Sequence, residues 1–220
     1  TRYGDAKAAA QAFENAAHVV ALDITNQRLV ALTIEPRSVL AHIEQGRLVV
    51  RLSSQMPTGV RTTVCDLLGL PTDQVRVVVG DVGGGFGMKT GAYAEDVVVA
   101  YAAHRLQLPV KWIADRSEDF LSSAHGRDIQ TQVALALDAQ GKILALRVNT
   151  LANVGAYPVM TGVAIQLLIG PWVQTSVYDI PLIDFHFTGV MTNTSSTGAY
   201  RGAGRPEAIY NIERRSEEHT

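Results

Sequence analysis

Residues 75–89 read VRVVVGDVGGGFGMK, an apolar run that leads into four clustered glycines, one phenylalanine and a closing lysine. The apolar run predicts a strand at 75–79, and the spacing of apolar residues behind the glycines predicts a helix over 92–106. Glycines between a strand and a helix let backbone N–H groups approach a ligand, and the positive end of a helix favours an anionic group. The stretch therefore predicts either a ligand-binding loop or a tight turn.

Predicted helices, strands and hairpins follow one another outward from this stretch, with no repeat. The other predicted elements are a helix and a strand near the start, a hairpin, a helix capped by Gly69, a second hairpin that turns at 139–141, and a late strand: 6–16, 17–24, 38–54, 58–69, 129–153 and 183–191. Residues 191–207 are rich in small and polar residues and predict a loop. Hairpins among helices indicate an α+β fold rather than a pure doubly wound sheet.

The glycine cluster matches neither of the two common nucleotide-binding motifs. GxGxxG needs a glycine where this chain has Met88, and the P-loop needs a glycine directly before Lys89. A phosphate-binding loop of another kind stays open as an interpretation, because glycines between a strand and a helix are still present.

Composition and charge argue against several classes of function. The 19 basic and 21 acidic residues show no basic excess, so the charge pattern indicates neither nucleic acid nor an acidic membrane as a partner. The single cysteine, Cys65, cannot hold an iron–sulfur cluster, and the six histidines lack the spacing of a metal site. The apolar stretch 154–173 is interrupted by Pro158, Gln166 and Pro171, and it predicts buried loop and short helix instead of a membrane span.

Two polar residues stand out by their position. Gln55 follows a predicted strand immediately before a turn. Arg201 lies among small residues in a glycine-rich loop, where a guanidinium offers a planar fork to an oxyanion. Taken alone, each is more readily interpreted as a solvated surface residue.

A set of short motifs occurs in one order along the chain: NQR, IEPR, SSQ, GGGFG, PVKW, GAY, TN and AYRGAGRPE. From about residue 4 to Arg214 the set resembles the molybdopterin-binding large subunit of the xanthine dehydrogenase and aldehyde oxidase family. The AYRGAGR loop resembles the carbon-monoxide-dehydrogenase-like bacterial branch. Because so many motifs rarely combine by chance, the chain is identified as a fragment of such a subunit.

The resemblance implies two family domains. Residues 1–35 correspond to the end of the small N-terminal α/β domain, which is hammerhead-like, and residues 36–214 to part of the mixed α+β first molybdopterin-binding domain. The last residues, RSEEHT at 215–220, match the translation of a common sequencing-library adapter codon for codon. They predict a tail that is not native to the protein.

The resemblance also implies how the chain binds a cofactor. The molybdenum is held by the dithiolene sulfurs of a pterin, so no protein side chain is expected as a metal ligand. Gln55 is expected to donate a hydrogen bond to an oxygen on the metal, whereas the catalytic glutamate base of the family lies outside this chain. The other expected cofactor-binding residues lie in the two glycine-rich loops: Gly84, Gly85, Phe86, Gly87 and Arg201.

The implied activity is hydroxylation of an aldehyde or an N-heterocycle with oxygen from water. In the expected substrate pocket, purine-oxidising members have a glutamate and an aromatic residue where this chain has Thr90 and Ala203. Carbon monoxide dehydrogenases have a copper-binding cysteine where it has Gly202. Neither purine nor carbon monoxide is therefore the expected substrate. The alternatives are a non-catalytic structural paralogue and a nucleotide-binding enzyme that uses the glycine loop for phosphate.

A complete enzyme of this family implies further cofactors and partners. The molybdopterin is expected in its cytosine dinucleotide form, and electrons leave through an iron–sulfur small subunit and an FAD-binding medium subunit. The expected assembly is a cytoplasmic dimer of heterotrimers, without nucleic acid or membrane. Because it lacks the glutamate base, the fragment alone is expected to be inactive.

Overall fold

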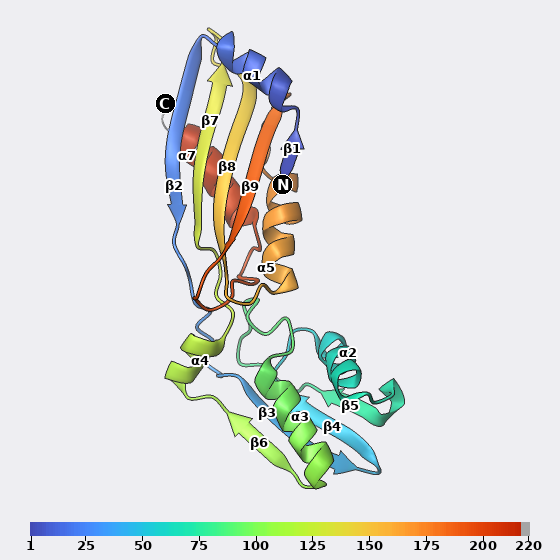
Figure 1. Ribbon diagram of the computed structural model, residues 1–220. Coiled ribbons are helices and arrows are strands. Elements are labelled where there is room, and N and C mark those ends of the chain that lie inside the picture. Colours follow the sequence, from blue (N-terminus) through green and yellow to red (C-terminus); the bar gives the residue numbers. More distant parts are fainter. Residues whose placement is uncertain (217–220) are drawn as a thin grey trace. The chain divides into compact units, whose positions relative to one another are not determined.

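Two mixed β-sheets organise the chain, each in its own compact unit (Figure 1). The computed structural model describes residues 1–216, and the side chains of residues 1–214. The five-stranded unit joins residues 1–29 to the chain from residue 124 onward, and the four-stranded unit is Val30–Ser123. Each unit has its own apolar core.

The five-stranded sheet has the strand order β1-β9-β8-β7-β2. Its strands are β1 (Arg2–Gly4), β2 (His18–Asn26), β7 (Ile129–Leu137), β8 (Ile143–Gly155) and β9 (Ile183–Met191). Neighbouring strands are antiparallel except β8 and β9, which are parallel. Because β2 pairs with β7 along its whole length, the start of the chain and its later part share one sheet.

Buried and exposed side chains alternate along β7, and this alternation explains how helices cover the sheet. Ile129 and Leu135 are buried while Gln130 and Gln132 are exposed, because successive side chains of a strand point to opposite faces. Helix α7 (Arg205–Ser216) lies along the apolar face (Figure 1). Its Ile212 is 1% exposed and joins the core. Small residues on the other face admit α1 (Ala6–Glu14): Ala9, Ala136 and Ala145.

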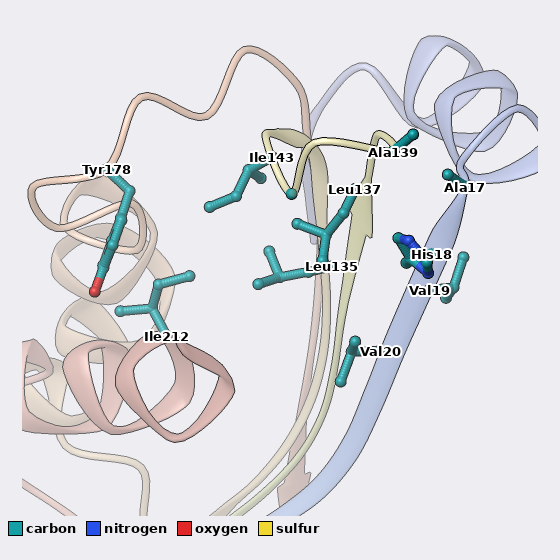
Figure 2. Close-up of a pocket in the computed structure, with 11 residues that line it drawn as sticks. Ala17, His18, Val19, Val20, Leu135, Leu137, Ala139, Ile143, Tyr178 and Ile212 are labelled. Atoms are coloured by element: carbon teal, nitrogen blue, oxygen red, sulfur yellow. The ribbon is translucent and has the colours of Figure 1, made fainter. Parts of the chain in front are cut away.

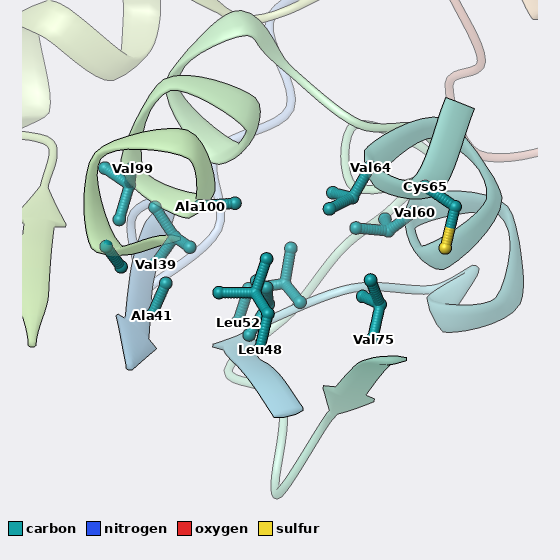
Figure 3. Packing of buried hydrophobic residues seen from close by; sticks show 12 residues of the cluster. Val39, Ala41, Leu48, Leu52, Val60, Val64, Cys65, Val75, Val99 and Ala100 are labelled. Carbon is teal, nitrogen blue, oxygen red and sulfur yellow. The ribbon is translucent and has the colours of Figure 1, made fainter. Parts of the chain in front are cut away.

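The four-stranded sheet has the order β5-β4-β3-β6. Its strands are β3 (Ser38–Glu44), β4 (Arg47–Leu52), β5 (Val75–Val78) and β6 (Val110–Ile113). The parallel pair β4 and β5 needs a crossover, and α2 (Pro57–Leu68) supplies it. Figure 3 shows side chains of α2 and of α3 (Ala94–Leu106) turned toward the strands, where they form one buried core.

Sequence signals set the ends of the two core helices. The fixed φ of Pro57 suits the first turn of α2, and Gly69 ends the helix with φ 66°. At the start of α3 the Asp96 carboxylate accepts a hydrogen bond from the N–H of Tyr93 at 2.9 Å, which is half of a capping box. The remaining helical segments are short: Thr72–Gln74 (η1), Arg116–Ser122 (α4), Met160–Ala164 (α5), Ile165–Ile169 (η2) and Gly170–Trp172 (α6).

Most predicted elements are confirmed to within two residues. The hairpin of β3 and β4, the helix capped by Gly69, the hairpin of β7 and β8 and the strand at 183–191 are all present. The first helix ends at Glu14 instead of residue 16, and α3 begins at Ala94 instead of residue 92. Mixed sheets packed against helices confirm the α+β class.

The prediction of a loop over 191–207 is wrong at its end, because α7 begins at Arg205. Gly202 and Gly204 immediately before this point, and Pro206 immediately after it, hide the start of the helix in the sequence. The helix forms where Ala208 and Ile212, 2% and 1% exposed, pack against the five-stranded sheet.

The prediction that 154–173 is buried is wrong for its largest side chains. Short helical segments are present as predicted, but Tyr157, Met160 and Trp172 are 81%, 81% and 74% exposed. Across the described residues, no helix combines the length and apolar character that a membrane span requires.

The predicted family domains and the predicted tail stay predictions. The two compact units divide the chain after residue 29 and after residue 123. The predicted division at residue 35 is a boundary between family domains, which is a different kind of boundary. Within the predicted non-native tail at 215–220, residues 217–220 lie outside the described residues.

Candidate functional site

The glycine loop, residues 83–89, follows β5 and has an unusual backbone. Gly84 and Gly87 have φ values of 102° and 100°, which glycine adopts without steric cost. Phe86 has φ 50°, a left-handed conformation that costs a residue with a Cβ atom about 1–2 kcal/mol, and its side chain is 42% exposed. A large apolar residue held in a strained, exposed position indicates a functional constraint.

Gln55 lies against this loop, at the turn between β4 and α2. Its backbone N–H donates to the Lys89 carbonyl oxygen at 2.8 Å, and its side-chain Oε1 accepts from the N–H of Gly87 at 2.9 Å. The bond to Gly87 fixes the orientation of the amide, because only the oxygen can accept. Among the described residues, the Nε2 group of Gln55 has no acceptor, so it remains as a donor for a ligand.

Close contacts with other side chains of the chain explain why positions 83 and 85 are glycine. A Cβ atom at position 85 would lie 2.5 Å from Oε1 of Gln55, and one at position 83 would lie 2.4 Å from Cβ of Glu35. At these two positions the groups that lie against the loop backbone are Gln55 and Glu35. The expected contacts of Gly84, Gly85, Phe86 and Gly87 with a cofactor stay predictions.

Lys89 is 2% exposed and turns its ammonium group into the unit. Its Nζ lies 3.1 Å from Glu35 Oε2 and 2.9 Å from Ser53 Oγ. Burial raises the pKa of Glu35, but hydrogen bonds from Ser53, Gly83 and Lys89 outweigh it and hold that pKa below its ordinary value. Sequence reasoning assigned no role to Glu35, although a lysine buried at the end of a glycine loop requires a counter-charge.

Thr90, an expected substrate-pocket residue, is half-buried and bound to the same loop. Its hydroxyl donates to the Gly87 carbonyl oxygen at 2.7 Å, and the Tyr93 hydroxyl donates to the Met88 carbonyl oxygen at the same distance. The four-stranded unit thus brings Gln55 and Thr90 to one loop.

The other expected residues, Arg201 and Ala203, belong to the loop before α7 in the five-stranded unit. Gly202 and Gly204 have φ values of 96° and 85°, and Ala203 also lies in the left-handed region at 47°. The N–H of Ala203 closes the turn by donating to the Tyr200 carbonyl oxygen at 2.7 Å. Arg201 is exposed, at the start of this strained turn.

Both glycine-rich loops lie within the part of the chain that matches one known family. The profile of the molybdopterin cofactor-binding domain matches residues 1–218. The chain belongs to this family. This match, together with similarity to carbon monoxide dehydrogenase large chains, confirms two predictions: the relation to large subunits of the xanthine dehydrogenase and aldehyde oxidase family, and the relation to the carbon-monoxide-dehydrogenase-like branch.

Relatives of this molybdopterin-binding chain include characterised large subunits. It is 34% identical to the nicotine 6-hydroxylase large subunit of Paenarthrobacter nicotinovorans, over 88% of this chain and 24% of the relative. It is 37% identical to the carbon monoxide dehydrogenase large chain of Hydrogenophaga pseudoflava, over 96% of this chain and 27% of the relative. The chain thus spans about a quarter of the length of these curated relatives.

A solved structure shares the fold. Quinoline 2-oxidoreductase from Pseudomonas putida 86 matches with a TM-score of 0.91 and 31% identity, over 99% of this chain and 29% of that one. The match extends to both units of the chain.

The glycine loop offers a hydrogen-bond donor that suits a bound cofactor. Among the described side chains, no group of three or more His, Cys, Asp or Glu residues could hold a metal ion. The glycine loop instead offers the Nε2 donor of Gln55 beside a backbone with positive φ values. These groups can donate hydrogen bonds to a bound cofactor without ligating a metal.

The nucleotide-binding alternative is not favoured by this geometry. A lysine that serves a phosphate must reach it with its ammonium group. In this loop the ammonium of Lys89 is buried against Glu35 and Ser53.

A separate cavity of about 790 Å³ lies in the five-stranded unit and contains none of the expected site residues. Figure 2 shows Leu135, Leu137 and Ile143 from the sheet facing Ile212 of α7 and Tyr178. Its walls are mainly apolar, and the Tyr178 hydroxyl is bound to Glu213 Oε2 at 3.0 Å. Its other polar side chain is His18, so the cavity lacks the convergent polar groups of a catalytic site.

Proposed function

We propose that the chain is part of the catalytic subunit of a molybdenum hydroxylase that oxidises an aldehyde or an N-heterocycle. The observation that carries the proposal is the hydrogen bond from Gly87 to Gln55, which leaves an amide donor at a strained glycine loop in a molybdopterin-binding family. When bound, the cofactor supplies hydroxylation with oxygen derived from water. Relatives named for nicotine and quinoline, both N-heterocycles, support this substrate class.

Each loop residue has a proposed role toward the cofactor. Gln55 donates through Nε2 to an oxygen on the metal, and the backbone of Gly84, Gly85 and Gly87 lies against the cofactor. Phe86 forms a wall of the site, which accounts for an exposed aromatic ring in a strained conformation.

Arg201 is proposed to bind the cofactor through its guanidinium. Glycines on its loop hold the backbone in a left-handed turn that exposes the side chain. A guanidinium suits anionic oxygens because its N–H groups form a planar fork.

Thr90 and Ala203 are proposed to border the substrate. The Thr90 hydroxyl is already bound to Gly87, and Ala203 has no ring to stack on a flat substrate. Neither residue offers purine a charged clamp or a stacking surface. With Gly202 in place of a copper-binding cysteine, carbon monoxide is also disfavoured as the substrate, although one relative oxidises it by name.

The proposal extends to the form of the cofactor and to the assembly of the complete enzyme. The molybdopterin is the cytosine dinucleotide form, and the partners are an iron–sulfur subunit and an FAD subunit in a cytoplasmic dimer of heterotrimers. Names of relatives as subunits of larger complexes support partner subunits in general.

The test is expression of the complete subunit with its partners, followed by metal analysis and assays in ¹⁸O-labelled water. We expect bound molybdenum and transfer of ¹⁸O into an aldehyde or N-heterocyclic substrate, but not into hypoxanthine. A folded complex without molybdenum, or a product without ¹⁸O, would contradict the proposal.

A further inference from the structure

One carboxylate joins the two ends of the glycine loop. Glu35 Oε2 accepts hydrogen bonds from the N–H of Gly83 at 2.7 Å and from Lys89 Nζ at 3.1 Å. The backbone N–H of Glu35 also donates to the Gly83 carbonyl oxygen at 3.1 Å. The first and the last residue of the loop are therefore held by the same residue.

The buried ammonium makes this arrangement specific. Lys89 Nζ contacts three oxygens: Glu35 Oε2, Ser53 Oγ and the Glu35 carbonyl oxygen, the last two at 2.9 Å. Its side chain is 1% exposed, whereas that of Glu35 is 34% exposed. A desolvated ammonium is stable only when it is paired and hydrogen-bonded, so the loop end cannot move without breaking these contacts.

The backbone of Lys89 passes this constraint to Gln55. The Lys89 carbonyl oxygen accepts from the N–H of Gln55 at 2.8 Å and from Ser54 Oγ at 3.4 Å. Oε1 of Gln55 accepts in turn from Gly87, two residues earlier in the loop. The side chain of Lys89 thus points to Glu35 while its main chain holds the glutamine.

We propose that Glu35 and Lys89 form a clamp that positions the glycine loop and Gln55 to receive the molybdopterin cofactor, an inference that rests on the proposed function. Both are positioning residues: Glu35 acts through the backbone of Gly83, and Lys89 acts through its own carbonyl oxygen, which holds the backbone of Gln55. The lysine that closes the loop thereby has a role that requires no phosphate.

The test compares variants of the complete subunit in its complex with partners. Lys89→Met removes the ammonium but keeps an unbranched apolar side chain, and the double variant Glu35→Gln/Lys89→Met removes both charges. Arg147→Met is the control, because it breaks the Arg147–Asp184 ion pair (3.1 Å) in the other unit.

Two readouts other than activity separate positioning from folding. Amide hydrogen exchange of Gly83, Gly87 and Met88 reports loop order, and molybdenum per polypeptide reports cofactor binding. We expect Lys89→Met to raise exchange at these amides at least about 10-fold and to lower molybdenum content, since bonds to charged groups are lost. The double variant should unfold near the wild-type temperature because no charge is left unpaired, yet show the same fast exchange.

Unchanged exchange in both lysine variants would overturn the clamp, and so would fast exchange with wild-type molybdenum content. Equal changes in amide exchange and molybdenum content in Arg147→Met would show that the loss of any ion pair has this effect, and this result would also overturn the clamp. A wild-type complex without molybdenum would contradict the proposed function instead, and the exchange rates would still decide whether Lys89 orders the loop.

Discussion

Gly85 shows how single atoms shape the site. The glycine is required because its missing Cβ leaves room for the Gln55 amide, not because the turn needs a left-handed residue. Gly91, a few residues later, has open space around it. Two glycines near in sequence therefore differ in what they contribute.

We predict that Gly85→Ala displaces the Gln55 side chain, which breaks its hydrogen bond with Gly87 and lowers the free energy of unfolding by about 0.5–1.5 kcal/mol. Urea denaturation measures the loss. Gly91→Ala is the matched control and should be nearly neutral, so equal stability of the two variants would contradict the role given to Gly85.

Arg37 connects several elements of the four-stranded unit from the start of β3. Its Nε donates to Asp119 Oδ1 of α4 at 3.0 Å, and its guanidinium lies 3.9 Å from the ring centre of Tyr93. Arg37 and Asp119 are 4% and 1% exposed, so neither charge is solvated.

We predict that Arg37→Leu destabilises this unit by about 3–5 kcal/mol, because Asp119 is left as a buried charge without its main partner. Chemical denaturation of the complete subunit checks the value. Arg147→Leu, which breaks an ion pair whose arginine side chain is 41% exposed, should cost no more than about 1 kcal/mol. Similar losses in both variants would refute the distinction.

Asp96 makes the cap of α3 sensitive to pH. Burial raises the pKa of Asp96 to about 6 from 3.8, although the Tyr93 hydrogen bond and the charge of Arg37 both lower it. Between these values the folded chain binds more protons than the unfolded chain. The stabilising contribution of Asp96 is therefore complete below pH 3.8 and is lost as the pH rises through about 6.

We predict that replacing Asp96 by asparagine removes this dependence. The free energy of unfolding of the wild type relative to Asp96→Asn should fall by about 1 kcal/mol between about pH 5 and about pH 7. Urea denaturation at both pH values measures it, with the exposed Asp66→Asn as the control. A relative stability that rises with pH would contradict the assignment.

At the scale of the whole molecule, the two units are interleaved in sequence. The four-stranded unit is one continuous segment with its own core, whereas the five-stranded unit needs both flanking segments because β2 pairs with β7.

We predict that Val30–Ser123, expressed alone, folds with a cooperative transition, because its apolar core is complete within the segment. Residues 124–214 alone should not do so, since they lack the edge strand β2 that covers β7. Circular dichroism during thermal unfolding tests both fragments. A cooperative transition only in the second fragment would contradict this division.

The sequence predicts the elements well where local chemistry sets their limits. Pro57 and Gly69 delimit α2, and a period of two identifies β7 and its hairpin with β8. The sequence does not predict the start of helix α7, because the stability of this helix depends on the contact of Ile212 with a distant sheet. Long-range packing of this kind leaves no local pattern.

The residues of the candidate site also fall into those that the sequence predicts and those that only the fold reveals. Gln55 and the glycine loop could be predicted from motifs, and the structure adds the hydrogen bond that orients the amide. Glu35 could not be assigned a role from sequence, because its partners Gly83 and Lys89 lie about fifty residues away and meet it only in the fold.

The most direct test of the central claim is turnover per bound molybdenum in the complete complex carrying Gln55→Ala. We predict a fall of about 10²–10³-fold, as for loss of one preorganised hydrogen-bond donor, with near wild-type stability. Gln140→Ala, in an exposed turn of the five-stranded unit, is the control and should retain full turnover. Turnover per molybdenum in Gln55→Ala equal to that of the wild type would contradict the claim that this amide acts at the cofactor.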